Sequence, residues 1–334
     1  MSLEGARNAP MVLPSHPTSS KLSVMGDVDA NEHVALLALL DERPGKMTWS
    51  AIASEVALRG SAIALWDEIH PAALDGMSDD RDRLARACEN LDAWRNSDFD
   101  LVTVLDPEYP VSLREIHQLP PILFVKGKLH PEEIGVSVVG SRAATDRGIS
   151  VATHVARGLA DRGISVLSGL AAGIDTAAHT AAIEAGGRPV GVIGTGINKT
   201  YPAANRDLHA QVAAHGALIS QFLPDAPPQQ HNFPIRNATM SGLGRASVVI
   251  EAGERSGARI QARLAIDHGR PVVLTDLVVR TTSWGKALVG RPGVHVAGST
   301  AEVMNIVERV VATDLGRSNV PTLIPSPAGN ENLG

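Results

Sequence analysis

The chain has 334 residues, and 44% of them are hydrophobic, enough to build a sizeable core in one large or two ordinary domains. No run approaches the roughly 20 apolar residues of a membrane-spanning helix. The single cysteine, Cys88, excludes an internal disulfide framework and a multi-cysteine zinc site. We therefore expect a cytoplasmic protein with no membrane part. The net charge of −6 argues against a nucleic-acid partner, but residues 31–130 carry 10 Lys and Arg against 17 Asp and Glu, whereas residues 136–275 carry 13 against 9. Any site for a polyanion therefore belongs in the second half of the chain.

The first hundred residues predict a flexible leader followed by a small helical domain. Residues 1–30 contain prolines and a Ser/Thr cluster without hydrophobic periodicity, which is typical of a flexible leader. Residues 31–97 have apolar side chains at helical spacing, and we expect a small helical domain of the SAM-like type there. Segment 43–49 joins two of its helices; such hairpins sometimes grip DNA, but the acidic balance favours a packing or protein-contact role. Cys88 lies in a helical pattern and is expected to be a buried structural thiol.

Residues 98–312 predict an α/β domain. Segment 98–134 has a short strand and paired prolines, and it should act as a rigid connector into this domain. From Gly135 onward, β-branched runs alternate with helical segments, which indicates an extended Rossmann-like, doubly wound, mostly parallel sheet. The expected strands are 136–139, 165–167, 189–193, 217–220, 247–250, 271–274 and a weaker one at 294–297. Residues 313–334 are rich in Pro, Ser and Asn and predict a disordered tail.

Ligands of such sheets bind beyond the carboxyl ends of the strands, so the glycine-bearing turns there are the candidate site. The first turn contains Gly140, which lets backbone amides approach a phosphate, with Ser141 as a hydroxyl donor and Arg142 as a forked cation. In the alternative interpretation Gly140 only relieves crowding and Arg142 is solvated. The dinucleotide fingerprint Gly-x-Gly-x-x-Gly is absent from this turn, so we expect no NAD or FAD and no other cofactor.

The next two turns carry a possible acid–base pair and a possible nucleotide-binding group. Asp175 and His179 are four residues apart on one helix face, which suits either an acid–base pair or a capping Asp that holds a scaffold His. No nucleophile or metal partner is evident, so a scaffold role for His179 is favoured and no metal is expected.

The third turn contains Lys199, which offers a charge for phosphate, and Tyr201, which offers a ring for base stacking, with Asn205 just beyond. Because Tyr201 precedes a proline, an equal alternative is that its ring is buried and anchors the turn.

The fourth and fifth turns add further donors. A proline-stiffened loop should present Phe233, Arg236 and Asn237 beside a helix start, which supplies a ring and hydrogen-bond donors for a single strand. Backbone amides at Ser256 and Gly257, which open the following helix, would complete an anion pocket. Arg255, Arg259 and Arg263 lie nearby in the sequence.

In chain order these turns resemble the DNA-processing protein A (DprA/Smf) family, a group of competence-associated recombination mediators. The resemblance spans about residues 106–274 and rests on the motifs GSR, SGLAAGID, GTGINKTYPAAN, ALISQF, FPIRN with SGLG, and VVIEAG with SG. It implies binding of single-stranded DNA, a homodimer formed through the Rossmann-like domain, and loading of a RecA-type recombinase during natural transformation. The implied DNA pocket includes Arg142, Lys199 and Arg236, with Ser141, Asn205 and Asn237 as polar neighbours.

The sequence departs from this family at several positions. Ala238 replaces a second basic residue after FPIRN, segment 258–261 replaces a small-residue stretch with a threonine, and Thr275-Asp276 replaces Pro-Gly. The winged-helix appendage of some relatives has no counterpart.

The main hypothesis is therefore a non-enzymatic module that binds single-stranded DNA. One alternative is an enzyme that releases bases from nucleoside monophosphates with Glu251 as its acid–base group, although the Pro-Gly-Gly-x-Gly-Thr signature of such enzymes is missing. Another is a diverged interaction protein with weak DNA binding, which Ala238 and the acidic front half both permit.

Overall fold

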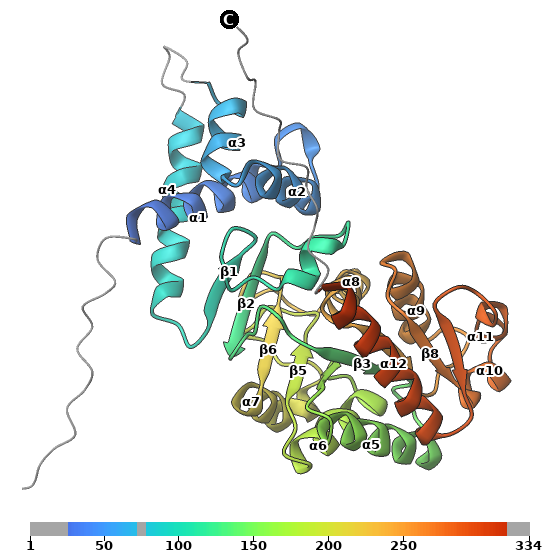
Figure 1. The fold of residues 1–334 in the computed structure, drawn as a ribbon. Coiled ribbons are helices and arrows are strands. Elements are labelled where there is room, and N and C mark those ends of the chain that lie inside the picture. The colour runs from blue at the N-terminus through green and yellow to red at the C-terminus, as the bar shows by residue number, and fades with distance from the viewer. Residues whose placement is uncertain (1–25, 72–77, 319–334) are drawn as a thin grey trace, which may run out of the picture.

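The computed structural model describes residues 26–71 and 78–318, which form a helical unit followed by a nine-stranded α/β unit (Figure 1). The helical unit comprises α1 (Gly26–Glu42), the short 3-10 helix η1 (Pro44–Lys46), α2 (Trp49–Arg59), α3 (Ala62–Ile69) and α4 (Ser78–Arg95). Thr48 and Ser61 cap α2 and α3, since their hydroxyls accept hydrogen bonds from the amides of Ala51 and Ala64.

Two expectations for this region are wrong. Because α1 begins at Gly26, residues 26–30 are helical rather than part of a leader; residues 1–25 lie outside the described part of the chain. Cys88 is exposed, not buried. The buried neighbour is Ala87, and one helical step of about 100° turns Cys88 toward solvent.

The sheet has the strand order β1-β2-β6-β5-β4-β3-β7-β8-β9. Its strands are β1 (Asp100–Thr103), β2 (Ile122–Gly127), β3 (Gly135–Val139), β4 (Ser165–Ser168), β5 (Pro189–Val192), β6 (Ala217–Ser220), β7 (Ala246–Val249), β8 (Val272–Thr275) and β9 (Val294–Ala297). The stretch from β6 to β9 is parallel, which confirms the doubly wound α/β fold and the seven strands expected after Gly135.

Segment 98–134 is more than the connector that was expected. Its strands β1 and β2 extend the sheet in antiparallel fashion, and β2 pairs with β6 through Phe124 and Ser220. The apolar run Ile122–Val125 is buried throughout, so pairing at the sheet edge removes it from water. Phe124 also makes edge-to-face contacts with Trp94 of α4 and Phe99, at centroid distances of 5.0 and 5.6 Å, and these contacts fix the helical unit against the sheet.

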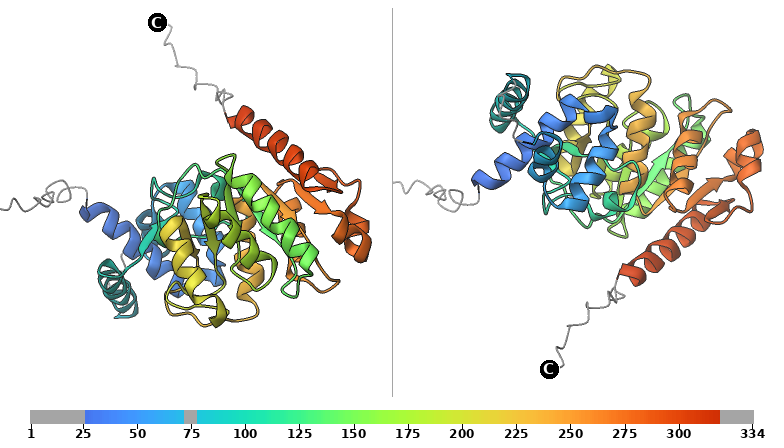
Figure 2. Two further views of the ribbon diagram at one scale, coloured as in Figure 1. Left: turned by 90° about the horizontal axis from the view of Figure 1, so that it is seen from below. Right: turned by 90° about the horizontal axis from the view of Figure 1, so that it is seen from above.

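Helices cover both faces of the parallel part. One face carries α5 (Asp146–Ala160), α6 (Ile174–Glu184), α7 (Arg206–His215) and α12 (Thr300–Ser318), and the other carries α8 (Asn232–Leu243) and α9 (Gly257–Asp267). Two short helices, α10 (Asp276–Thr281) and α11 (Ser283–Leu288), follow β8. Figure 2 shows the helical unit at one end of the sheet and α10–α12 near the other. Because α12 continues to Ser318, residues 313–318 are helical, contrary to the expected tail, and 319–334 lie outside the described residues.

The strand order places a crevice at one defined point. From β3 the chain proceeds outward through β4, β5 and β6 on one side and through β7, β8 and β9 on the other. The turns after β3 and β7 therefore diverge to opposite faces, and ligands of doubly wound sheets bind in the crevice that opens there.

Candidate functional site

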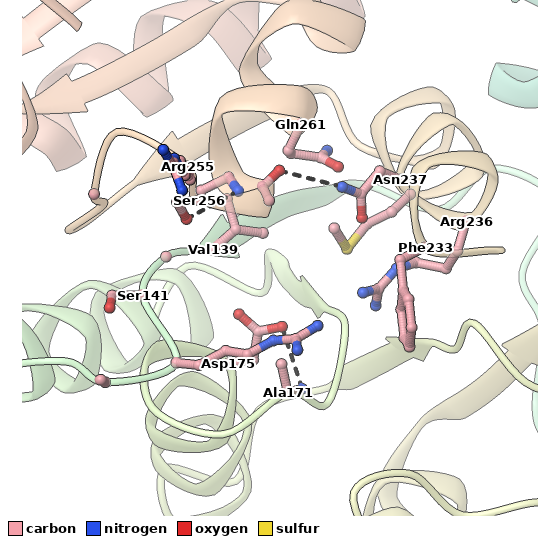
Figure 3. Close-up of a pocket in the computed structure, with 17 residues that line it drawn as sticks. Val139, Ser141, Ala171, Asp175, Phe233, Arg236, Asn237, Arg255, Ser256 and Gln261 are labelled. Carbon is pink, nitrogen blue, oxygen red and sulfur yellow. Dashed lines mark hydrogen bonds between the residues drawn. The ribbon is translucent and has the colours of Figure 1, made fainter. Parts of the chain in front are cut away.

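A pocket of about 540 Å³ occupies this crevice (Figure 3). Among the residues expected from the sequence it is lined by Gly140, Ser141, Arg142, Asp175, Phe233, Arg236, Asn237, Ser256 and Gly257. Figure 3 shows Phe233 and Arg236 on one side, Arg255 and Ser256 across from them, and Asp175 below. The structure thus brings together residues from the turns after β3, β4 and β7 and from α8.

The turn after β3 contributes an exposed cation. The Arg142 side chain is exposed, and its Cζ lies 5.5 Å from the centroid of the Phe233 ring, within the range of a cation–π contact. No carboxylate among the described residues pairs with Arg142. At Gly140 a Cβ atom would lie 2.6 Å from the Ile174 side chain and 2.7 Å from the carbonyl oxygen of Glu251, so this glycine does relieve crowding.

Arg236 forms the buried base of the pocket. Its side chain is only 6% exposed, and Nη1 donates a hydrogen bond of 2.7 Å to the carbonyl oxygen of Val192 at the end of β5. Burial lowers the pKa of the guanidinium, and attraction to Asp175 opposes that shift. Arg236 remains charged even so, because an arginine guanidinium is not deprotonated in proteins near neutral pH.

Arg236, Asn237 and Phe233 do not lie on a loop, as the prolines suggested, but on α8. The helix begins at Asn232, so Pro234 falls in its first turn. There the missing N–H of a proline breaks no intrahelical hydrogen bond. The helix consequently fixes the three side chains on a rigid element, which a loop would not do.

Asp175 and His179 are both buried and serve different purposes. Asp175 Oδ2 accepts hydrogen bonds from the amides of Gly169 and Ala171, at 3.1 and 3.3 Å, and thereby shapes the turn after β4. Burial raises the pKa of Asp175, and Arg236 opposes that rise. His179 is fully buried, and burial lowers its pKa to about 4, so the ring is neutral at neutral pH. This geometry favours the scaffold alternative over an acid–base pair.

Two aromatic rings stand at the rim of the pocket. The Tyr201 ring is 40% exposed, so it is not the buried turn anchor that its proline neighbour permitted. Its centroid lies 5.7 Å from that of Phe233, and both rings line a shallow cavity of about 90 Å³ that shares Arg142 and Arg236 with the larger pocket. Cations beside accessible aromatic rings are the combination that holds phosphates and stacks bases in single-stranded nucleic acids.

The turn after β7 closes the opposite side. The Ser256 hydroxyl accepts a hydrogen bond from the Ala258 amide at 3.2 Å and caps α9, whose first residue is Gly257. Asn237 Nδ2 donates to the Gly257 carbonyl at 3.4 Å, which connects α8 to this turn. Arg255 is exposed here and lines the pocket. The sequence placed Arg255 only near the site, although its position in the turn after the fifth expected strand was the available signal.

Lys199 and Asn205, both expected to bind DNA, line neither the pocket nor the small cavity beside Tyr201. Lys199 Nζ lies 3.2 Å from Asp225 Oδ1 in an exposed ion pair. The Asn205 amide is buried and donates to the Leu170 carbonyl and the Thr176 hydroxyl, both at 2.9 Å. Asn205 therefore joins two turns, and its amide hydrogens are engaged within the protein.

Glu251 has a structural position. Its carboxylate accepts hydrogen bonds from the amide of Thr145, at 3.1 and 3.3 Å, and from the Thr145 hydroxyl at 2.8 Å. Thr145 is the cap of α5, so the carboxylate lies at the positive end of that helix, where a negative charge is stabilising. Glu251 does not line the pocket, and this geometry gives no support to an acid–base role.

Within the described residues, the pocket combines three arginines, Arg142, Arg236 and Arg255, with a single lining carboxylate, Asp175. Its local charge is therefore positive, although the whole chain carries −6. No group of three or more His, Cys, Asp or Glu side chains within residues 26–71 and 78–318 is placed to hold a metal ion. Over the same residues, no helix is both long and apolar enough to cross a membrane.

Comparison with known proteins gives a consistent result. The family model for DNA recombination-mediator protein A matches residues 100–308. Protein Smf of Synechocystis is 38% identical over 187 residues, which cover 54% of this chain and 47% of that protein. The chain spans about half the length of the curated relatives that it matches.

Two solved structures are similar to this fold. The structure of DNA processing protein A from Streptococcus pneumoniae is 28% identical with a TM-score of 0.61, covering 84% of this chain and 93% of that one. DNA processing protein A from Helicobacter pylori, described for its single-stranded DNA binding mode, is 20% identical with a TM-score of 0.56, covering 63% and 97%.

Proposed function

Because the chain belongs to the DNA recombination-mediator protein A family, we propose that it binds single-stranded DNA in the pocket between the turns after β3 and β7. The observation that carries the proposal is the set of three pocket arginines beside two rings, the half-buried Phe233 and the exposed Tyr201. The Helicobacter pylori relative, whose described property is single-stranded DNA binding, supports the same ligand.

Each part of the pocket has a task in this proposal. Arg142 and Arg255 neutralise phosphates on the exposed rim, and Arg236 supplies a fixed positive potential from below. Phe233 and Tyr201 stack bases, which contributes roughly 1–3 kcal/mol per base without sequence preference. The protein then acts by holding and presenting a strand rather than by catalysis.

Membership in the family supports a proposal for the wider role. We propose that the bound strand is passed to a RecA-type recombinase during DNA uptake and recombination in the cytoplasm. We also propose that the protein works as a homodimer formed through its Rossmann-like unit.

The test is fluorescence anisotropy with single-stranded and double-stranded oligonucleotides over a salt series. Two phosphate contacts on a single strand, from Arg142 and Arg255, predict a slope of log affinity against log salt of about −1.4, at about 0.7 per contact. Arg142→Glu should abolish tight binding, while Arg157→Glu, an exposed α5 residue outside the pocket, should leave it unchanged. Failure of the parent to bind at low salt would refute the proposal, and an unaffected Arg142→Glu would refute the pocket.

A further inference from the structure

A second cavity, of about 590 Å³, lies on the other side of α8 from the DNA pocket. One wall is the η1–α2 segment of the helical unit, with Arg43, Lys46 and Trp49, and the other is formed by α8 and α9, with Ile235 and Arg263. We refer to this cavity, with those five residues, as the η1–α8 groove. The proposed function of the DNA pocket gives this groove no role.

The charge of the η1–α8 groove is opposite to that of the unit that builds half of it. Residues 26–95, the helical unit, carry 7 Lys and Arg against 14 Asp and Glu, but no Asp or Glu is found among the described residues that line the groove. Arg43, Lys46 and Arg263 line it instead. The surface therefore presents concentrated positive charge, which is the footprint of a polyanion site.

The acidic side chains of the helical unit are engaged elsewhere. Glu55 and Glu68 both pair with Arg59, and Glu42 lies 2.8 Å from His70 Nε2. Asp41 lines a neighbouring cavity together with Arg43, but its carboxylate pairs with Arg86 at 3.1 Å. Within the part of the chain that the structure describes, neither Arg43 nor Lys46 forms an ion pair with a carboxylate. Arg263 is the exception in part, since its Nε lies 4.0 Å from Asp267 on α9, at the outer limit of an ion pair.

The groove also offers apolar surface beside its cations. Trp49 Nε1 donates a hydrogen bond of 3.1 Å to the Leu40 carbonyl, which fixes the indole, and Arg43 Cζ lies 6.0 Å from its centroid. Across the groove the Ile235 side chain is 43% exposed. A fixed ring and an apolar side chain next to cations suit nucleic-acid bases and phosphates together.

The two walls are held in a fixed relation. Buried residues of the helical unit and of the sheet belong to one continuous hydrophobic core, which includes Ile52 of α2 and Phe124 of β2. Because the core is shared, the groove is already formed before any ligand binds, and binding need not supply the ordering cost.

Helix α8 separates the groove from the DNA pocket and contributes to both. Its residues Phe233 and Arg236 line the pocket, whereas Pro234 and Ile235 line the groove. A helix with its side chains is about 10–12 Å across, so at about 3.4 Å per stacked nucleotide a strand needs only about three nucleotides to pass over it.

We propose that the η1–α8 groove is a second subsite for single-stranded DNA, which receives the strand as it leaves the pocket across the first turn of α8. The inference rests on the proposed function of the pocket. It assigns the helical unit a direct contact with DNA phosphates through Arg43 and Lys46.

Oligothymidines of two lengths test this inference. One of about 6 nucleotides fills the pocket alone, and one of about 20 nucleotides also reaches the groove. Arg43 and Lys46 have φ angles of 53° and 66°, so both are changed to Asn, which tolerates left-handed backbone. Arg43→Asn/Lys46→Asn should weaken binding of the long oligonucleotide about tenfold and reduce its salt slope by about 1.4, while binding of the short one is unchanged.

A matched control removes two charges from the same unit outside the groove. Arg81→Gln/Arg95→Gln changes the net charge equally, and neither of these α4 residues lines the groove. It should bind both oligonucleotides like the parent. Arg263→Gln, on the opposite wall, should reproduce the loss for the long oligonucleotide alone, and circular dichroism confirms folding of each variant.

The outcomes separate the two proposals. If the parent binds neither length, the proposed function fails. If the parent binds both and the Asn variant binds both equally well, the pocket stands and the groove subsite is overturned. Equal weakening by the control pair would also overturn it, because the effect would then reflect net charge rather than the groove.

Discussion

Gly169→Ala tests whether the buried position of Arg236 matters for both stability and DNA binding. A Cβ atom at Gly169 would lie 1.7 Å from Arg236 Nη1 and 2.4 Å from Cζ, so the guanidinium must move. The φ angle of Gly169 lies outside the left-handed region, so alanine causes no backbone strain. The substitution therefore displaces Arg236 without removing its charge.

The expected magnitude follows from the bond that is lost. Moving the guanidinium breaks its 2.7 Å hydrogen bond to the Val192 carbonyl, and a hydrogen bond to a charged group contributes about 1.5–3 kcal/mol. Alanine regains about 0.4–1 kcal/mol by restricting the unfolded chain, which leaves a net loss of about 1–2 kcal/mol in the free energy of unfolding. The displaced cation should also weaken single-stranded DNA binding about tenfold, equivalent to about 1.4 kcal/mol.

Urea unfolding and fluorescence anisotropy measure the two effects, with Gly298→Ala as the control. A Cβ at Gly298 would meet only Glu302 Oε2, at an ordinary 3.6 Å, and Gly298 is outside the pocket. In an Arg236→Gln background, Gly169→Ala should have little further effect, because the group it displaces is gone. Parent-like stability and affinity in Gly169→Ala, or full additivity of the two changes, would refute this reasoning.

Three other predictions concern residues away from direct DNA contact. Burial lowers the pKa of His179 from 6.5 to about 4, so between these pH values the unfolded chain binds more protons than the folded one, and stability is lost as the pH falls. Urea unfolding of the parent and of His179→Leu measures this effect. The parent should lose about 2 kcal/mol more of its free energy of unfolding than the variant between about pH 7 and pH 5. Glu251→Gln should lower the free energy of unfolding by about 1 kcal/mol, because it weakens the contact with Thr145 at the N-terminus of α5. The variant should bind DNA as the parent does, and neither protein should release a base from nucleoside monophosphates. Base release by the parent that is lost in the variant would contradict this. Cys88 is exposed and should react with one equivalent of a thiol reagent in the native protein, whereas labelling only in denaturant would contradict its position.

The parallel sheet was predictable because its strands carry a strong local signal. All residues of β3 and β7 are buried, so both strands appear in the sequence as short runs rich in valine, without the alternation of a half-exposed strand. The antiparallel edge was not predicted, since prolines around β2 look the same in a connector as in a strand that pairs with β6. That pairing depends on a contact between residues about 95 positions apart, such as Phe124 and Ser220.

The sequence predicted the kinds of side chain in the site, but it did not predict correctly which cations line the pocket. Lys199 and Arg255 both follow a strand in a turn that contains glycine, and the sequence favoured Lys199. In the sheet, β7 borders the switch point directly, whereas β4 separates β5 from β3. The turn after β7 therefore brings Arg255 into the pocket, while Lys199, after β5, pairs with Asp225 instead. Strand order, which local sequence does not encode, decides which of two similar cations can reach the ligand.

The net charge of a segment is also a poor guide to where a polyanion can bind. The acidic balance of residues 31–130 favoured a packing or protein-contact role for segment 43–49, because phosphate binding needs local positive charge. Electrostatic attraction at close range depends on the few charges within about one Debye length, roughly 8 Å at physiological salt, and not on the sum over a unit. Glu55 and Glu68 are engaged with Arg59, whereas Arg43 and Lys46 line the groove. An acidic helical unit can thus present a basic face to the sheet, and the contribution of that face to DNA binding should appear only with strands long enough to cross α8.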